Sequence, residues 1–164
     1  MFIEGLQRGF TLIELIVVIS VVGLMLFFTI PNLQGNLLPQ SPEDVTRWII
    51  RAEKMLRENA VRHNRRYTLH LDLPTGKIWF SDESMMPGDI EESAAKAKKL
   101  SGDIKISEVR FPLKDYTALE RAEIRFYPKG YSDKAVIRLS KGYSERYSLH
   151  IEPFLPGVRV FKDE

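Results

Sequence analysis

The sequence predicts an α+β protein in which one long N-terminal helix, half of it in a membrane, precedes a domain of antiparallel β-sheets. Two observations predict this class. Residues 10–30 form an apolar run with a single charged side chain, and the chain beyond residue 66 consists of short alternating segments separated by Gly and Pro turns. Between these regions, apolar residues recur at the three-to-four spacing of an amphipathic helix.

The composition limits the classes of function. The 164 residues suffice for one membrane segment and one compact domain. The 24 basic and 22 acidic side chains give a formal net charge of +2, so no strong overall field indicates a nucleic-acid partner. Cysteine is absent, which excludes a disulfide framework, a thiolate metal site and a cysteine nucleophile.

The apolar run from Phe10 to Ile30 is long enough to span a bilayer, because a helix of this length covers about 30 Å. A secretory signal would have a shorter apolar region followed by a small-x-small cleavage site, and no such site follows Ile30. We therefore predict a retained transmembrane and assembly helix over residues 10–31. Its one charged residue, Glu14, is either solvated near the membrane surface or paired with a group of another molecule.

Residues 8–14, RGFTLIE, followed by the apolar run, resemble the type III signal sequence of type IV pilins and type II secretion pseudopilins. The resemblance implies that prepilin peptidase cuts between Gly9 and Phe10, removes the leader 1–9 and methylates the amine of Phe10. It also implies that Glu14 pairs with the N-terminal amine of a neighbouring subunit, a charge pair that favours assembly in register. The leader would then be cytoplasmic, and the chain after Pro31 would lie outside the inner membrane.

Residues 32–66 are predicted as a linker followed by an amphipathic helix. Pro31, at the boundary, either ends the first helix or bends a longer one. Ser41 before Pro42 is typical of a helix N-cap. One apolar face is expected to pack on a sheet: Val45, Ile49, Ala52, Leu56 and Ala60. The charged residues are expected on the opposite, solvent-facing side: Arg47, Arg51, Glu53, Lys54, Arg57 and Glu58.

Arg62, Arg65 and Arg66 form a basic group at the end of this helix, together with His63. Cations here complement the negative end of the helix dipole, which is a structural role. The alternative is a patch that binds DNA phosphates.

Residues 67–164 are predicted as a β-rich domain with a surface insertion at 81–103. The segment from Tyr67 to Leu73 alternates strictly, and Lys77 to Phe80 returns after a Pro-Thr-Gly turn, which predicts a hairpin. Residues 146–157, RYSLHIEPFLPG, repeat the order of RYTLHLDLPTG in that hairpin and predict a second one. The remaining expected elements are strands at 104–111, 122–127 and 134–139 and a short helix at 90–100.

This order of elements, with FYPKG, IRLSKG and PGVRV in the C-terminal half, is similar to the GspH/FimT family of minor pseudopilins and minor pilins. The resemblance implies a pilin-like fold, and a minor pseudopilin of a type II secretion system whose partners are other pseudopilins, prepilin peptidase, inner-membrane lipid, and the secretion channel or cargo. The alternative is a type IV pilus minor pilin that acts as a DNA receptor. That branch tends to end in Gly-Arg-x-Arg, of which this chain keeps only Arg159.

No enzyme signature is present. His63, His70 and His150 are candidate metal ligands, but solvent-facing strand histidines are the commoner outcome, so no metal site is expected. No nucleophile stands beside the acids, and no Gly-rich phosphate loop occurs. We therefore expect a structural protein without a cofactor.

Overall fold

The computed structural model describes residues 12–21, 41–101, 103–142 and 145–163. They fall into two units, a helix at 12–21 and a domain that begins with α2 (Pro42–Arg62), and each is described by itself. The predicted cap of α2 is confirmed. The Ser41 hydroxyl accepts the Asp44 N–H at 3.2 Å, while Asp44 Oδ2 accepts the Ser41 N–H at 3.1 Å.

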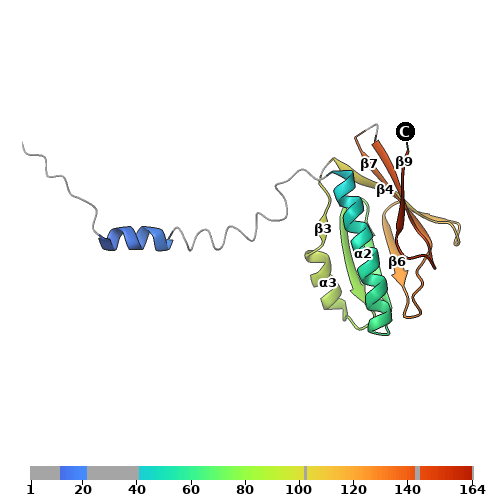
Figure 1. The fold of residues 1–164 in the computed structure, drawn as a ribbon, viewed down its shortest axis with the longest axis horizontal. Helices are drawn as coiled ribbons and strands as arrows, with labels where there is room; N and C mark the ends of the chain where they lie inside the picture. Colours follow the sequence, from blue (N-terminus) through green and yellow to red (C-terminus); the bar gives the residue numbers. More distant parts are fainter. Residues whose placement is uncertain (1–11, 22–40, 102, 143–144, 164) are drawn as a thin grey trace, which may run out of the picture. The chain divides into compact units, whose positions relative to one another are not determined.

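The domain contains two antiparallel sheets (Figure 1). The four-stranded sheet has the order β3-β2-β1-β6, and the five-stranded sheet has the order β5-β4-β7-β8-β9. The strands of the first sheet are β1 (Tyr67–Asp72), β2 (Lys77–Asp82), β3 (Lys98–Lys99) and β6 (Arg121–Phe126). Those of the second are β4 (Ile104–Phe111), β5 (Tyr116–Ala118), β7 (Ala135–Lys141), β8 (Glu145–Ile151) and β9 (Val158–Asp163).

The core lies between α2 and the two sheets, because α2 contacts β1 and β6 of one sheet and β7 and β9 of the other. All five residues of its predicted apolar face are at most 5% exposed. The alternation of the first hairpin is also confirmed, with Leu69, Leu71 and Leu73 buried and Leu69 opposite Phe80. Gly76 turns this hairpin at φ +64°, a conformation that favours glycine.

The insertion at 81–103 differs from its prediction. Its helix, α3, spans Pro87–Ala95 rather than 90–100, because Asp89 Oδ2 accepts the Met86 N–H at 3.0 Å and starts the helix earlier. The chain then adds β3 to the edge of β2 and buries Leu100 in the core. The end of the insertion is therefore part of the fold.

The two similar hairpins belong to different sheets. The first is β1–β2 in the four-stranded sheet, and the second is β8–β9 in the five-stranded sheet. The shared residue order therefore reflects the same local requirement of a hairpin in two places.

Candidate functional site

The helix at 12–21 carries apolar side chains around its whole circumference. Apart from Glu14 and Ser20 its residues are aliphatic, and they are between 48% exposed, in Ile16 and Val21, and 76% exposed, in Leu12. A helix that is apolar on all sides is typical of a buried or membrane-embedded segment. Ser20 satisfies its hydroxyl locally by donating to the Ile16 carbonyl at 2.8 Å.

Glu14 is on this helix, whereas Gly9, Phe10 and Pro31 lie outside the described residues. Among the helices of the described ranges, none has both the length and the apolar character to cross a membrane. Both ends of the segment predicted at 10–31 lie beyond residues 12–21. The spanning helix, the cleavage after Gly9 and the pairing of Glu14 therefore stay predictions.

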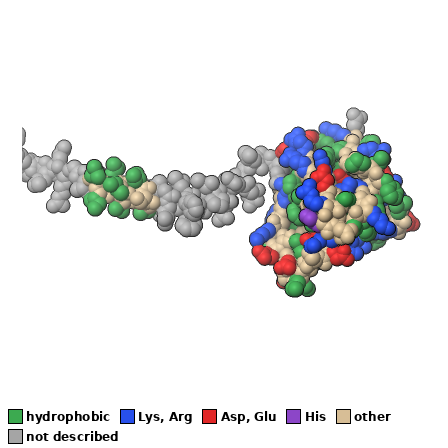
Figure 2. All heavy atoms as spheres, turned by 60° about the horizontal axis from the view of Figure 1, so that its bottom comes forward, with side chains coloured by type: hydrophobic (Ala, Val, Ile, Leu, Met, Phe, Trp, Pro, Cys, Tyr) green, Lys and Arg blue, Asp and Glu red, His purple; other side chains and the backbone are tan. Residues whose placement is uncertain are grey.

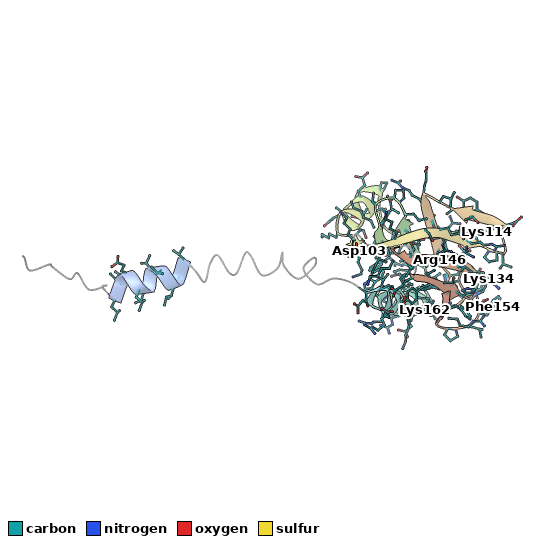
Figure 3. The ribbon with its side chains drawn as sticks, turned by 90° about the horizontal axis from the view of Figure 1, so that it is seen from above. Asp103, Lys114, Lys134, Arg146, Phe154 and Lys162 are labelled. Atoms are coloured by element: carbon teal, nitrogen blue, oxygen red, sulfur yellow. The ribbon has the colours of Figure 1, made fainter. Side chains whose placement is uncertain are left out.

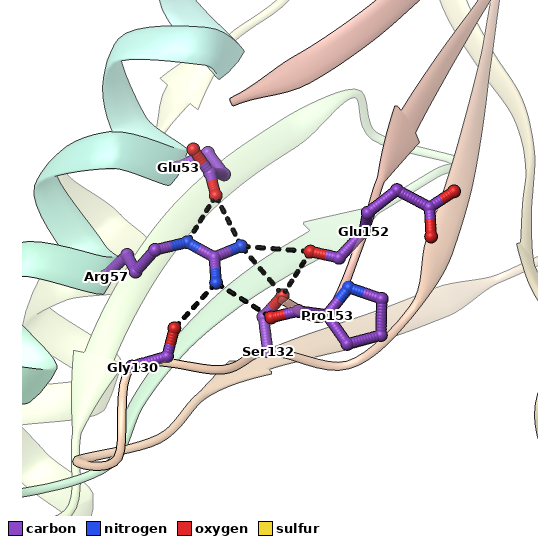
Figure 4. A network of polar contacts seen from close by, with 6 residues as sticks. All are labelled: Glu53, Arg57, Gly130, Ser132, Glu152 and Pro153. Carbon is purple, nitrogen blue, oxygen red and sulfur yellow. Dashed lines mark hydrogen bonds and ion pairs between the residues drawn. The ribbon is translucent and has the colours of Figure 1, made fainter. Parts of the chain in front are cut away.

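A buried ion pair between Glu53 and Arg57 joins α2 to two loops of the sheets (Figure 4). Arg57 Nε donates to Glu53 Oε1 at 2.7 Å, and Arg57 Nη1 donates to the carbonyls of Gly130 and Pro153 at 2.8 and 2.9 Å. Arg57 Nη2 donates to Ser132 Oγ and to the Glu152 carbonyl, both at 3.1 Å. The forked guanidinium thus bonds the loop after β6, the loop after β8 and its own helix at once.

This network corrects the expectation that Glu53 and Arg57 face solvent. Glu53 is 0% exposed and Arg57 9% exposed. The i, i+4 spacing lets the two side chains pair along one helix face, and the pair neutralises charge that would otherwise be costly to bury. The two loops supply carbonyls that need donors inside the domain, and helical periodicity alone gives no sign of them.

The predicted basic patch at the end of α2 is largely neutralised. Arg65 Nη1 lies 3.5 Å from Asp82 Oδ1, and Arg66 Nη2 lies 3.8 Å from Glu83 Oε1. Within the described ranges, Arg62 is the arginine of this group that has no ion pair. The patch therefore offers less free positive charge to a phosphate than the sequence indicates.

Arg159 lies on β9 in the other sheet and donates to Glu152 Oε1 at 2.9 Å. Glu152 also pairs with Lys134, whose Nζ lies 3.3 Å from Oε2. Burial raises the pKa of the Glu152 carboxyl, but the bonds to Lys134 and Arg159 outweigh it and the net pKa is lowered. Figure 2 shows the same mixing on one face of the domain, where basic, acidic and apolar side chains alternate. Arg159 is thus not joined to the basic group of α2.

The histidines are separated and differently bonded. His70 Nε2 lies 2.8 Å from Ser81 Oγ, the ring stacks on Trp79 at 5.1 Å, and burial lowers its pKa. His150 is on a strand of the other sheet and packs edge-on against Phe161, while His63 Nδ1 lies 2.7 Å from the Tyr67 hydroxyl. Among the residues that the structure describes, no group of three metal-ligating side chains occurs.

Tyr147 contacts the first turn of α2, and the sequence pattern does not predict this contact. Its hydroxyl donates to Glu43 Oε1 at 2.7 Å across 104 residues. This bond lowers the pKa of Glu43 and raises the pKa of Tyr147. Glu43 is in the first turn of α2, where a negative charge also complements the helix dipole.

Comparison with known proteins gives two findings that cover different parts of the chain. Residues 6–30 match the model of the prokaryotic N-terminal methylation motif. The fold matches the minor pseudopilin EpsH from the type 2 secretion system of Vibrio cholerae, with a TM-score of 0.51. That match has 9% identity and covers 74% of this chain and 97% of the other. No curated protein sequence matches significantly.

The motif lies where the sequence predicted cleavage and methylation, and the matched fold has the predicted order of an N-terminal helix before antiparallel sheets. The motif match at the N-terminus and the fold match of the domain each support the predicted resemblance to pilin-like proteins. The chain therefore combines a prokaryotic N-terminal methylation motif with a fold similar to that of a minor pseudopilin.

Proposed function

We propose that this chain is a minor pseudopilin of a type II secretion system, a structural subunit of GspH type that does no chemistry and holds no cofactor. The observation that carries the proposal is the presence in one chain of the methylation motif and of a domain with the EpsH fold. Either one alone is less specific, since the motif says nothing of the domain and a shared fold says nothing of processing.

The subunit would act by moving from bilayer to filament. Prepilin peptidase frees the amine of Phe10, and the helix over 10–31 leaves inner-membrane lipid to pack against other pseudopilins. As the resemblance of its motif implies, Glu14 would pair with the N-terminal amine of a neighbouring subunit, and this charge pair would favour assembly in register. The periplasmic domain then contacts neighbouring subunits, the secretion channel or cargo.

The domain has the rigidity that such a role needs. The bonds of Arg57 to Gly130, Glu152 and Pro153 fasten loops of both sheets to α2, which follows the predicted filament segment after residues 32–40. A displacement of the helix is therefore transmitted to the sheets as one body.

The alternative function, a type IV pilus minor pilin that receives DNA, is disfavoured by charge. Arg65, Arg66 and Arg159 all have carboxylate partners, and an ion-paired arginine gains less from a phosphate.

Deletion of the gene in its own bacterium, with complementation, separates the two functions. We expect the deletion to reduce release of secreted enzymes into the medium, the wild-type chain to restore it, and DNA uptake to be unchanged. Normal secretion together with lost DNA uptake would overturn the proposal in favour of the receptor. Retardation of DNA by the domain from Ser41 onward, steeply weakened by salt, would point the same way.

A further inference from the structure

Cations that have no ion pair with a described carboxylate gather at one end of the domain. Of the 24 Lys and Arg residues, all but Arg8 are described, which leaves 23. Twelve of these have a described carboxylate within 4.0 Å. Of the other eleven, seven lie at the end where α2 begins and are here called the proximal cations: Lys77, Lys98, Lys99, Lys105, Lys141, Arg146 and Lys162.

The strand register places these residues together. The start of β4, the end of β7 and the start of β8 meet at one end of the five-stranded sheet, since Ile104 pairs with Lys141 and Lys141 pairs with Glu145. The Tyr147 hydroxyl joins this end to Glu43 in the first turn of α2. Figure 3, which views the domain from above, labels Asp103, Arg146 and Lys162.

The four-stranded sheet adds the remaining cations. Lys77 stands between Lys99 on β3 and Asp72 on β1, so the repulsion between the two lysines is offset only in part by the Asp72 carboxylate. Lys98 Nζ lies 5.6 Å from the ring centre of Trp48, on α2. The arrangement therefore has an internal cost that an external anion would relieve.

Acidic side chains at this end are fewer than the proximal cations. Of the described side chains, Glu43, Asp72, Asp103 and Glu145 lie among them, so the described excess is seven minus four, or three positive charges. Elsewhere the described cations are mostly paired, as with Lys114 on Asp133 and Lys134 on Glu152. The excess is thus local, in a chain whose formal net charge is +2.

The proximal cations lie at the end of the domain that the chain enters from the predicted membrane helix, and this position indicates which anion they bind. Residues 32–40 join the predicted membrane helix to Ser41, and nine residues reach at most about 30 Å even when fully extended. The proximal cations thus lie at the end of the domain that joins this short segment, whereas Gly130, bonded to Arg57 in the fifth turn of α2, lies about 22 Å further along that helix.

We propose that the proximal cations bind the anionic phospholipid headgroups of the membrane in which the chain is anchored, and hold the domain against the bilayer before assembly. The proposal rests on the membrane anchorage in the proposed function. The attraction of a cation to an anionic surface falls off within a Debye length of about 10 Å, so the contact is reversible and is weakened by salt. Filament assembly must break it, which makes release from lipid a step in recruitment.

The absence of cysteine permits a direct test on the full chain. A donor dye is placed on Asp103→Cys at the proximal end or on Lys129→Cys in the turn beside Gly130, and the chain is inserted into vesicles with acceptor-labelled headgroups. The vesicles contain phosphatidylcholine with or without phosphatidylglycerol. We expect phosphatidylglycerol to raise energy transfer at residue 103 more than at residue 129, and high salt to abolish the rise.

The test variant is Lys99→Glu, Lys105→Glu and Arg146→Glu, three exposed proximal cations. Since each cation near an anionic surface contributes about fivefold, the ratio of docked to undocked domain should fall by about a hundredfold or more. The matched control, Arg51→Glu, Arg62→Glu and Arg110→Glu, changes three exposed and unpaired cations elsewhere by the same charge and should have no effect. Circular dichroism checks that both variants fold.

Three outcomes would overturn the proposal: equal transfer with and without phosphatidylglycerol, equal loss in both variants, or competition by inorganic phosphate beyond that of chloride at the same ionic strength. The last would assign the site to free phosphate. Flotation with vesicles separates this failure from failure of the anchor. A chain that does not float with either lipid refutes both, whereas one that floats without a lipid-dependent rise refutes the headgroup contact alone.

Discussion

Replacement of Arg57 by methionine tests whether the buried network holds the sheets to α2. The change leaves the Glu53 carboxylate, 0% exposed, without its cation. It also removes the Arg57 donor from the Gly130 carbonyl and one of the two donors from the Pro153 carbonyl, which keeps the Ser132 N–H. Removing one partner of a buried ion pair costs about 3–5 kcal/mol. Because domains of this kind are stable by about 5–15 kcal/mol, the loss is a large fraction of the total.

The same helix supplies the control. Lys54 and Glu58 form an ion pair at the same i, i+4 spacing, but their side chains are 75% and 56% exposed, and such pairs contribute about 0.3–0.5 kcal/mol. We therefore expect Arg57→Met to destabilise the domain by at least about 2.5 kcal/mol more than Lys54→Met. Adding Glu53→Leu to Arg57→Met removes the orphaned charge and should recover part of the loss.

The assay is guanidinium unfolding of the domain from Gln40 onward, followed by the fluorescence of Trp48 on α2 and Trp79 on β2. Both tryptophans should report one transition if helix and sheet unfold together. Equal destabilisation by Arg57→Met and Lys54→Met would refute the assignment of the network as the fastening between helix and loops.

Three further predictions follow from the caps, the histidine and the membrane segment. Ser41→Ala should cost about 1 kcal/mol of stability by loss of the helix cap, measured by guanidinium unfolding, and wild-type stability would contradict the cap. The pKa of Asp44, lowered to about 2 chiefly by the Ser41 N–H and then by Arg47, should stay low in this variant because alanine keeps that N–H. Because the pKa of His70 is lowered in the fold, the unfolded chain binds a proton that the native one does not, so the unfolding free energy should fall as pH drops below 6.5. His70→Asn should reduce this slope in unfolding titrations on either side of pH 6.5, and a wild-type slope would refute the assignment. Glu14→Ala should leave membrane insertion intact and lower recovery in sheared filaments; normal recovery would exclude its pairing role.

The parts of the fold that the sequence predicts are those in which burial follows backbone periodicity. Leu69, Leu71 and Leu73 alternate because one face of β1 is buried, and the five apolar residues of α2 recur because one face of the helix is buried. The cap at Ser41 is equally local, since both of its bonds lie within four residues.

The features that escape prediction depend on distant segments. Arg57 looks like a solvent-facing residue until the carbonyls of Gly130 and Pro153, more than 70 residues away in sequence, are placed beside it. β5 has three residues, too few for a recognisable pattern, and exists because it pairs with the end of β4. The end of α3 is likewise set by the pairing of Lys98 and Lys99 with β2.

For the candidate site, the N-terminal motif is readable from sequence because its residues act through their order, and the match of residues 6–30 confirms it. The role of the basic residues cannot be predicted from their order in the sequence. Arg65, Arg66 and Arg159 suggest a phosphate site by composition, and only the fold shows their carboxylate partners. The proximal cations are dispersed along the sequence from Lys77 to Lys162 and meet through strand register.

The most direct test of the central claim, that this chain is a processed pilin-like subunit, is the intact mass of the protein recovered from cells with and without prepilin peptidase. With the peptidase, we predict loss of Met1 to Gly9 and the addition of one methyl group on the amine of Phe10. Without it, the full leader should remain. An intact Met1 in cells that process other prepilins would contradict the account.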